Sequence, residues 1–208
     1  DKVWIGPQSI EKATVAFRAA LPMLKEALEA NPAHKAVISV SGGSGVMKTC
    51  VSALLTYYLT QLGVGAYTMS GDNYPRRIPV QNDAERMRIF RLGGIRGMLQ
   101  EGVYNPENAA TLKELQLADT DSEPKMVEEH PWLAAYQKAG REALSGYLGT
   151  DLEQEYDQLE NVLTQFKAGQ EKVWLKRLGN EDADLWYDEK DFSQTDVLVL
   201  EWTHGNSG

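Results

Sequence analysis

A glycine-rich segment follows a short apolar run in the first quarter of the chain, and its spacing restricts the fold. Gly42 is followed by four residues and then by Met47, Lys48 and Thr49. Apart from Met47, which stands where a glycine is usual, this is the pattern of a phosphate-binding P-loop. Glycines let such a loop point backbone N–H groups at phosphates, and the following helix adds its positive end. The segment therefore predicts a nucleotide-binding loop within an α/β fold.

Each residue type in this loop has an expected task. Lys48 would reach the β- and γ-phosphates of ATP, and the Thr49 hydroxyl would bind Mg²⁺. Cys50 follows on the helix, where a small buried packing residue is the ordinary role of a single cysteine. A glycine-rich turn without a ligand is the alternative interpretation. The predicted nucleotide-binding segment comprises Gly42, Gly43, Ser44, Gly45, Val46, Met47, Lys48, Thr49 and Cys50.

Met47 is the departure from the pattern, because glycine tolerates positive φ and close approach of a ligand whereas methionine does not. Two outcomes are open. Met47 has helical φ and ψ in the first helical turn and its side chain points away from the phosphates, or it narrows the loop and weakens or alters nucleotide binding. We expect the first outcome, because Lys48, Thr49 and three glycines are retained.

The segments around the loop supply the context that a P-loop requires. The apolar, β-branched run 36–40 predicts a strand buried on both faces of a parallel sheet, and a helix is expected over 48–62. Further strands are expected at 66–70 and 196–200, the second ending in Glu201. This order predicts a three-layer α/β P-loop fold with a mainly parallel sheet and helices on both faces.

Helical periodicity dominates the rest of the chain. The run 9–30 has apolar residues at helical spacing, with Ser9 as its expected N-cap, and Pro22 is expected to kink or split it. The run 82–100 is also helical in pattern, and Gly93-Gly94 is expected to weaken or break it.

These patterns predict a single domain over residues 1–208. Within it we expect an N-terminal helical extension at 1–32 and a helical insertion or cap at 101–150. Smaller elements are expected at 131–148 and 156–167, which are helical in pattern, and at 172–175, a short strand.

Composition excludes several classes of protein. With 208 residues, 42% hydrophobic and 25% charged, the chain has the make-up of a globular domain. Its net charge of −9 disfavours nucleic acid as a partner. No apolar run approaches the ~20 residues of a membrane span, and no signal peptide is visible. The single cysteine permits no intrachain disulfide, which fits a cytoplasmic location. A small molecule is the expected partner, and a homo-oligomer remains open.

A polar segment follows the second expected strand, at the edge where ligands bind in open α/β sheets. Asp72 lies in this segment, and a carboxylate there can accept the proton of a hydroxyl that attacks a γ-phosphate. Arg76 and Arg77 could hold an anionic substrate or transition-state charge. The alternative is an Asx-type turn with surface arginines.

The last expected strand ends in a second polar segment. Glu201 could orient Mg²⁺ through water, as Walker-B acids do. His204 is a candidate pocket residue, although a lone histidine more often has a structural or surface role.

These three elements together resemble the phosphoribulokinase/uridine kinase family of P-loop kinases. The likeness covers about residues 36–83 and 155–202. Its points are Ser41 to Gly45 with Lys48-Thr49, Gly71-Asp72 followed by Tyr74, the stretch from Tyr156-Asp157 through Leu163, Lys167 and Gly169 to Val173, and the strand 196–201 ending in glutamate.

The resemblance implies roles for particular residues. Asp72 would be the general base, Lys48 and Thr49 would serve ATP and Mg²⁺, and Glu201 would support the metal. In that family an arginine-bearing lid and later strands follow this glutamate, and we expect them to be absent from this chain. The residues that would line the acceptor pocket are Tyr74, Arg76, Arg77, Lys176 and Arg177.

The sequence therefore predicts an ATP-dependent kinase that transfers the γ-phosphoryl group to a hydroxyl of a nucleoside, a sugar, a sugar phosphate or a similar metabolite. The arginines near Asp72 favour an anionic acceptor. Two other interpretations remain. A nucleotide-binding regulatory module or pseudokinase would explain Met47, and a P-loop NTPase would activate water in place of an organic hydroxyl.

Overall fold

The computed structural model describes residues 5–43 and 45–203. The chain forms two compact units. The first comprises Asp1–Ile78 and Gln154–Gly208, and the second is Pro79–Glu153, so the helical insertion begins earlier than the expected residue 101. No helix in the described part is long and apolar enough to cross a membrane.

The first unit is built on a parallel three-stranded sheet in the order β1-β5-β2. Its strands are β1 (Ala36–Ser41), β2 (Ala66–Ser70) and β5 (Val197–Trp202). Glu201 of β5 pairs with Val40 on one side and with Ser70 on the other. All three strands therefore end at the same edge of the sheet, as the sequence predicted for a parallel arrangement.

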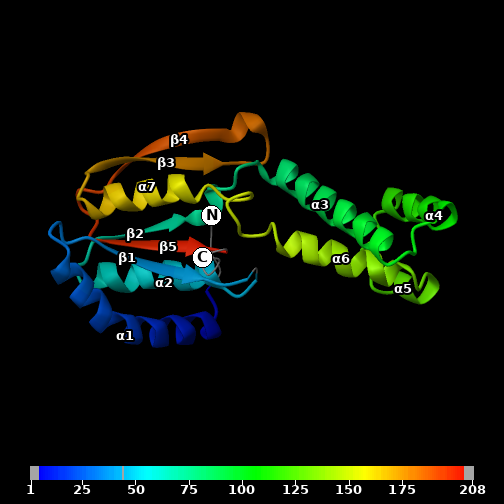
Figure 1. The fold of residues 1–208 in the computed structure, drawn as a ribbon. Helices are drawn as coiled ribbons and strands as arrows, with labels where there is room; N and C mark the ends of the chain where they lie inside the picture. Colours follow the sequence, from blue (N-terminus) through cyan, green and yellow to red (C-terminus); the bar gives the residue numbers. More distant parts are fainter. Residues whose placement is uncertain (1–4, 44, 204–208) are drawn as a thin grey trace. The chain divides into compact units, whose positions relative to one another are not determined.

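Helices cover both faces of the sheet (Figure 1). On one face, α1 (Pro7–Ala30) and α2 (Lys48–Gln61) pack Leu24, Leu55 and Leu59 against residues of β1 and β5. On the other face, α7 (Tyr156–Lys167) packs Phe166 and its neighbours against β2 and β5. This α/β arrangement is compatible with a P-loop fold.

The strand that is buried on both faces is β5 rather than β1. Four successive residues of β5, Val197 to Leu200, are buried, whereas most of β1 is only half-buried. The reason is position, because β5 is the central strand and β1 pairs with one described strand only. The expectation that the run 36–40 is buried on both faces was therefore wrong.

A second, antiparallel sheet contains a strand that the sequence analysis missed. It pairs β3 (Lys172–Leu178) with β4 (Leu185–Asp191), and the short helix η2 (Asp182–Asp184) lies between them. The residues of β4 are almost all exposed, so the strand has no alternation of buried and exposed residues to reveal it. Its pairing with β3 stabilises it instead.

Helix α1 differs from expectation at its start and in its middle. It begins at Pro7 after the N-cap residue Gly6, and Ser9 lies buried inside it. It also continues through Pro22 as one helix. Leu24 is in the apolar cluster with α2, and Phe17 packs against the same cluster. Contacts on both sides of Pro22 thus hold the helix together.

The second unit is helical. It contains α3 (Pro79–Gln100), α4 (Pro106–Leu117), the short α5 (Met126–Glu129) and α6 (Leu133–Ser145). Helix α3 runs unbroken through Gly93-Gly94, contrary to expectation. A Cβ atom on Gly94 would lie 2.4 Å from Tyr136, and one on Gly97 would lie 2.2 Å from the Cβ of Ala139. The glycines therefore allow close packing of α3 on α6, which stabilises the helix they would weaken in isolation.

Candidate functional site

The glycine-rich loop connects β1 to α2 through glycines in left-handed conformations. Gly42 has φ of 150° and Gly45 has φ of 80°, values that other residues adopt only with strain. A Cβ atom on Gly43 or Gly45 would meet nothing within 4 Å, so the loop backbone is open at these positions. Such a backbone permits close approach by a phosphate-sized group. Ser44 lies outside the described residues.

Lys48 begins helix α2 and is buried, which places its charge beneath the loop. Its Nζ donates a hydrogen bond to the Gly43 carbonyl at 3.0 Å. Val46 is exposed and Cys50 is half-buried. A cation held inside the loop, with a helix N-terminus directed at the same place, makes this end of α2 electrostatically suited to an anion.

Met47 adopts a left-handed backbone conformation, with φ of 69° and ψ of 26°. The expectation of helical φ and ψ was wrong, because Met47 is the N-cap of α2 and lies before its first helical residue. Its side chain reaches α1, where Ser9 Oγ donates to the Met47 sulfur at 3.3 Å. Methionine thus occupies a conformation that suits glycine, at a cost of about 1–2 kcal/mol, and its side chain has a partner on α1.

Thr49 and Glu201 come together across the sheet edge. Thr49 Oγ1 donates a hydrogen bond to Glu201 Oε1 at 2.6 Å. A threonine that donates its proton to a carboxylate still has oxygen lone pairs for a hard cation. The described residues contain no group of three or more His, Cys, Asp or Glu that could hold a metal. A Mg²⁺ ion bound here would therefore need further oxygen ligands from phosphates and water, which is its usual preference.

Asp72 lies in the short helix η1 (Gly71–Asn73), directly after β2. Both of its oxygens accept hydrogen bonds from Thr203, one from the backbone N–H at 3.0 Å and one from the hydroxyl at 2.8 Å. Thr203 follows β5, so Asp72 is held against the strand end that carries Glu201. Thr203 was not predicted as a site residue, because an isolated threonine 131 positions away gives no local signal.

Two predicted pocket residues have structural partners in the first unit. Tyr74 is buried, its hydroxyl accepts a hydrogen bond from the Lys176 backbone N–H, and burial raises its pKa. Lys176 is also buried, and its Nζ donates to the Pro75 carbonyl at 2.8 Å and to Glu155 at 2.7 Å. Both side chains therefore stabilise the junction of η1, β3 and the start of α7.

The predicted arginines are more accessible. Arg177 donates to Asp188 and to the Tyr67 hydroxyl, each at 3.0 Å. Arg76 is exposed and Arg77 is half-buried, both a few residues after Asp72. His204 lies outside the described residues.

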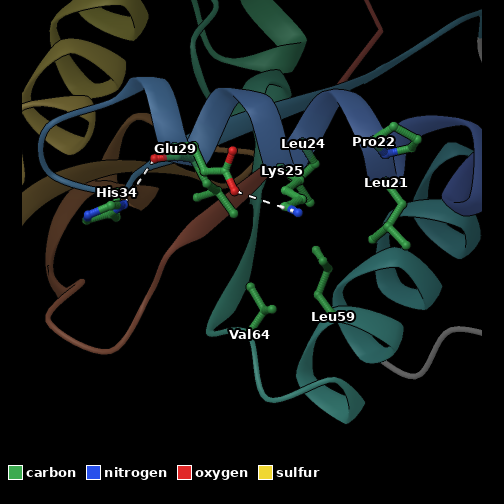
Figure 2. Close-up of a pocket in the computed structure, with 9 residues that line it drawn as sticks. Leu21, Pro22, Leu24, Lys25, Glu29, His34, Leu59 and Val64 are labelled. Carbon is green, nitrogen blue, oxygen red and sulfur yellow. Dashed lines mark hydrogen bonds and ion pairs between the residues drawn. The ribbon is translucent and has the colours of Figure 1, made fainter.

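A separate apolar groove lies between α1 and α2, with a volume of about 540 Å³ (Figure 2). Leu21 and Leu24 of α1 face Leu59 and Val64 across it. Val64 precedes β2, and His34 at the rim precedes β1, so the groove is at the amino-terminal edge of the strands. It does not coincide with the loop, which lies at their carboxyl ends.

The α/β unit thus has a glycine loop, a buried lysine and two carboxylates that accept hydrogen bonds from threonines, all at one edge of its sheet. Comparison with known proteins adds a relative. The chain is 34% identical over 179 residues to the bifunctional alpha-galactosidase/sucrose kinase AgaSK of Mediterraneibacter gnavus. The aligned region covers 86% of this chain but only 14% of that protein. No protein-family model and no solved structure matches the chain.

Proposed function

We propose that this chain is part of an ATP-dependent kinase that transfers the γ-phosphoryl group to a hydroxyl of a small metabolite. The observation that carries the proposal is the hydrogen bond from Thr49 to Glu201 at the start of α2. It joins the residue that follows the P-loop lysine to the acid of the adjacent strand, which is the arrangement required to hold Mg²⁺ beside a triphosphate.

The name of the relative includes two activities, and the chemistry of the loop distinguishes them. A glycoside hydrolase acts through two carboxyl groups on either side of the scissile bond. Here Asp72 and Glu201 each accept hydrogen bonds from a threonine, beside a glycine loop and a buried lysine. Such a loop serves phosphate rather than a glycosidic bond, so we assign the region to the kinase activity.

The residues of the chain have complementary tasks in this reaction. Lys48 neutralises charge on the phosphates, and Thr49 with Glu201 would hold Mg²⁺, which supplies further positive charge when bound. Asp72 accepts the proton of the acceptor hydroxyl. At the same time a bond forms between the hydroxyl oxygen and the γ-phosphorus, and the bond from that phosphorus to the bridging oxygen breaks, which releases ADP.

The acceptor proposed first is a sugar hydroxyl, and sucrose is the first compound to test because the relative's name specifies a sucrose kinase. A nucleoside and a sugar phosphate complete the panel. Arg76, which is exposed and lies four residues after Asp72, gives the sugar phosphate a specific reason for inclusion, because a guanidinium binds phosphate in bidentate fashion.

The test is phosphoryl transfer by the full-length protein from Mg·ATP to sucrose, followed by ³¹P NMR of the product. We expect a sugar phosphate to form together with ADP. Asp72→Asn should lower kcat by about 10²- to 10⁴-fold, the usual contribution of a general base, and leave the Kd for Mg·ATP unchanged. Release of inorganic phosphate without acceptor would favour an NTPase, and an unchanged rate in Asp72→Asn would remove that residue from its role.

A nucleotide-binding regulatory module is the second candidate, and the left-handed backbone at Met47 is the observation that favours it. Strain in the loop can lower affinity or turnover. This candidate predicts Mg·ATP binding without transfer to any member of the acceptor panel and without ADP release.

A further inference from the structure

We propose that Thr203 positions the Asp72 carboxylate for the acceptor hydroxyl, and that it acts through Asp72 rather than through contact with ATP. This inference rests on the proposed function, because it assigns to Thr203 a part in phosphoryl transfer. It adds a residue that the P-loop pattern does not contain, at the end of the strand that also carries Glu201.

The contact between the two residues fixes the whole carboxylate. Thr203 donates from its backbone N–H to Oδ1 of Asp72 and from its hydroxyl to Oδ2. Two donors from one residue, one to each oxygen, define the plane of the carboxylate as well as its distance from Thr203. Each carboxylate oxygen can accept about two hydrogen bonds, so each retains capacity for the proton of an acceptor hydroxyl.

The backbone around this contact is also restrained. A Cβ atom on Gly71 would lie 2.6 Å from Cγ of Trp202, so the η1 turn packs directly against the residue before Thr203. Trp202 is itself buried and packs edge-on against Tyr156, with their ring centroids 5.1 Å apart. The turn that carries Asp72 and the segment that carries Thr203 are therefore closely packed against each other.

The same strand end connects the base to the nucleotide loop. Glu201 accepts the hydrogen bond from Thr49, and Thr203 binds Asp72 only two residues later. The residue that holds the proton acceptor and the acid that would support Mg²⁺ thus lie two positions apart, at the carboxyl end of β5. Loss of the hydroxyl from Thr203 would leave only the backbone N–H bond to Oδ1, so the carboxylate could turn about that contact, while the Thr49–Glu201 contact remains.

The test compares Thr203→Val, which keeps the shape of the side chain, with Thr203→Ser, which keeps the hydroxyl. With Mg·ATP and sucrose, we expect Thr203→Val to lower kcat by about 10- to 100-fold, the scale of loss caused by a misplaced catalytic group. Its Kd for Mg·ATP should stay within about twofold of the wild type. Thr203→Ser should recover most of the loss.

Two controls separate positioning from general damage. Thr56→Val removes another threonine hydroxyl of the first unit, which hydrogen-bonds Thr68 at 2.6 Å, and it should leave kcat unchanged. In the Asp72→Asn background, Thr203→Val should cause no further loss of kcat, because residues that act as a unit are not additive.

The outcomes distinguish this inference from the proposed function. If the wild-type protein transfers phosphate to no member of the acceptor panel, the proposed function fails and this inference falls with it. If the wild type is active and Thr203→Val retains full kcat, the inference alone is overturned. An equal loss from Thr203→Val in the presence and absence of the Asp72 carboxylate would likewise show that Thr203 does not act through it.

Discussion

Carboxylates have opposite surroundings in the two units. In the helical unit, Glu153 is fully buried and accepts hydrogen bonds from Asn82, Arg86 and the Gly149 N–H. At the sheet edge of the first unit, Asp72 is exposed, and the described chain supplies it with hydrogen bonds from one residue only. The first carboxylate has used its acceptor capacity in the fold, and the second retains capacity for a ligand.

The buried Asp121 follows the same rule as Glu153. It accepts a hydrogen bond from the Tyr136 hydroxyl at 2.6 Å and pairs with Arg91 at 3.0 Å. Burial and the hydrogen bond to Asp121 raise the pKa of Tyr136. Burial of an ionised group is tolerated only when its partners are supplied, so a buried, fully partnered carboxylate indicates architecture. Asp72 is accessible and retains acceptor capacity, as its proposed role in proton transfer requires.

The largest expected effect on this contrast comes from Glu153→Ala. It removes the buried carboxylate that Arg86 contacts at 2.6 Å and leaves this arginine with the exposed Asp83 as its partner at 3.1 Å. The loss should destabilise the second unit by about 3 kcal/mol, the lower end for a broken buried pair. Amide hydrogen exchange over 79–153 should accelerate accordingly, while the Kd for Mg·ATP stays unchanged. The exposed Glu142→Ala on α6 is the matched control and should leave exchange unaltered.

A smaller loss is expected from Gly97→Ala. The new Cβ would meet the Ala139 Cβ at 2.2 Å and the Ala135 carbonyl oxygen at 3.2 Å. Overpacking costs about 1–3 kcal/mol and should outweigh the roughly 1 kcal/mol gained by removing a helical glycine. The matched Gly146→Ala has only ordinary contacts, the nearest at 3.5 Å, and should be neutral. Thermal unfolding of the two variants measures the difference, and equal Tm values would contradict the packing of α3 on α6.

Met47 permits a test in the first unit, within the glycine-rich loop. Met47→Gly and Met47→Ala both remove the side chain that contacts Ser9, but only glycine relieves the left-handed backbone at φ of 69°. The glycine variant should therefore be more stable than the alanine variant by about 1 kcal/mol, and both should bind Mg·ATP. An alanine variant as stable as the glycine variant would show that the loop carries no such strain.

Acidification should produce the smallest effect on stability, again in the second unit. Burial alone would raise the pKa of Glu153, but hydrogen bonds from Gly149, Arg86 and Asn82 outweigh it and hold that pKa below the ordinary value of 4.5. A carboxyl group whose pKa is lowered by folding stabilises the protein above the unfolded pKa and loses this contribution as the pH falls through the folded pKa. Unfolding measured from neutral pH to below 4.5 should therefore show a loss of stability that Glu153→Gln reduces.

Much of the fold of the first unit could be predicted from the sequence, but few of its side-chain contacts could. The order of strand, glycine loop, helix and strand placed Lys48, Thr49, Asp72 and Glu201 at one edge, because parallel strands end together. Local sequence patterns did not predict conformations that depend on contacts between residues far apart in the chain. The Met47 side chain contacts Ser9 of α1, and Asp72 is held by Thr203, which follows β5; neither contact leaves a periodic signal in the sequence.

The glycines of α3 give a further example in the helical unit. Gly93-Gly94 signals a break by intrinsic propensity, yet close packing on α6 reverses the outcome. Strand β4 is the opposite case, an element that forms although no sequence pattern predicted it. It is exposed and charged, and its pairing with β3 defines it.

Binding of Mg·ATP to the full-length protein, measured by calorimetry beside Lys48→Ala, tests the central claim most directly. We expect saturable binding by the wild type and a loss of at least about 100-fold in affinity for Lys48→Ala, because the variant removes the buried charge beneath the loop. Absence of binding by the wild type, or unchanged affinity in Lys48→Ala, would contradict the assignment of this loop to a nucleotide.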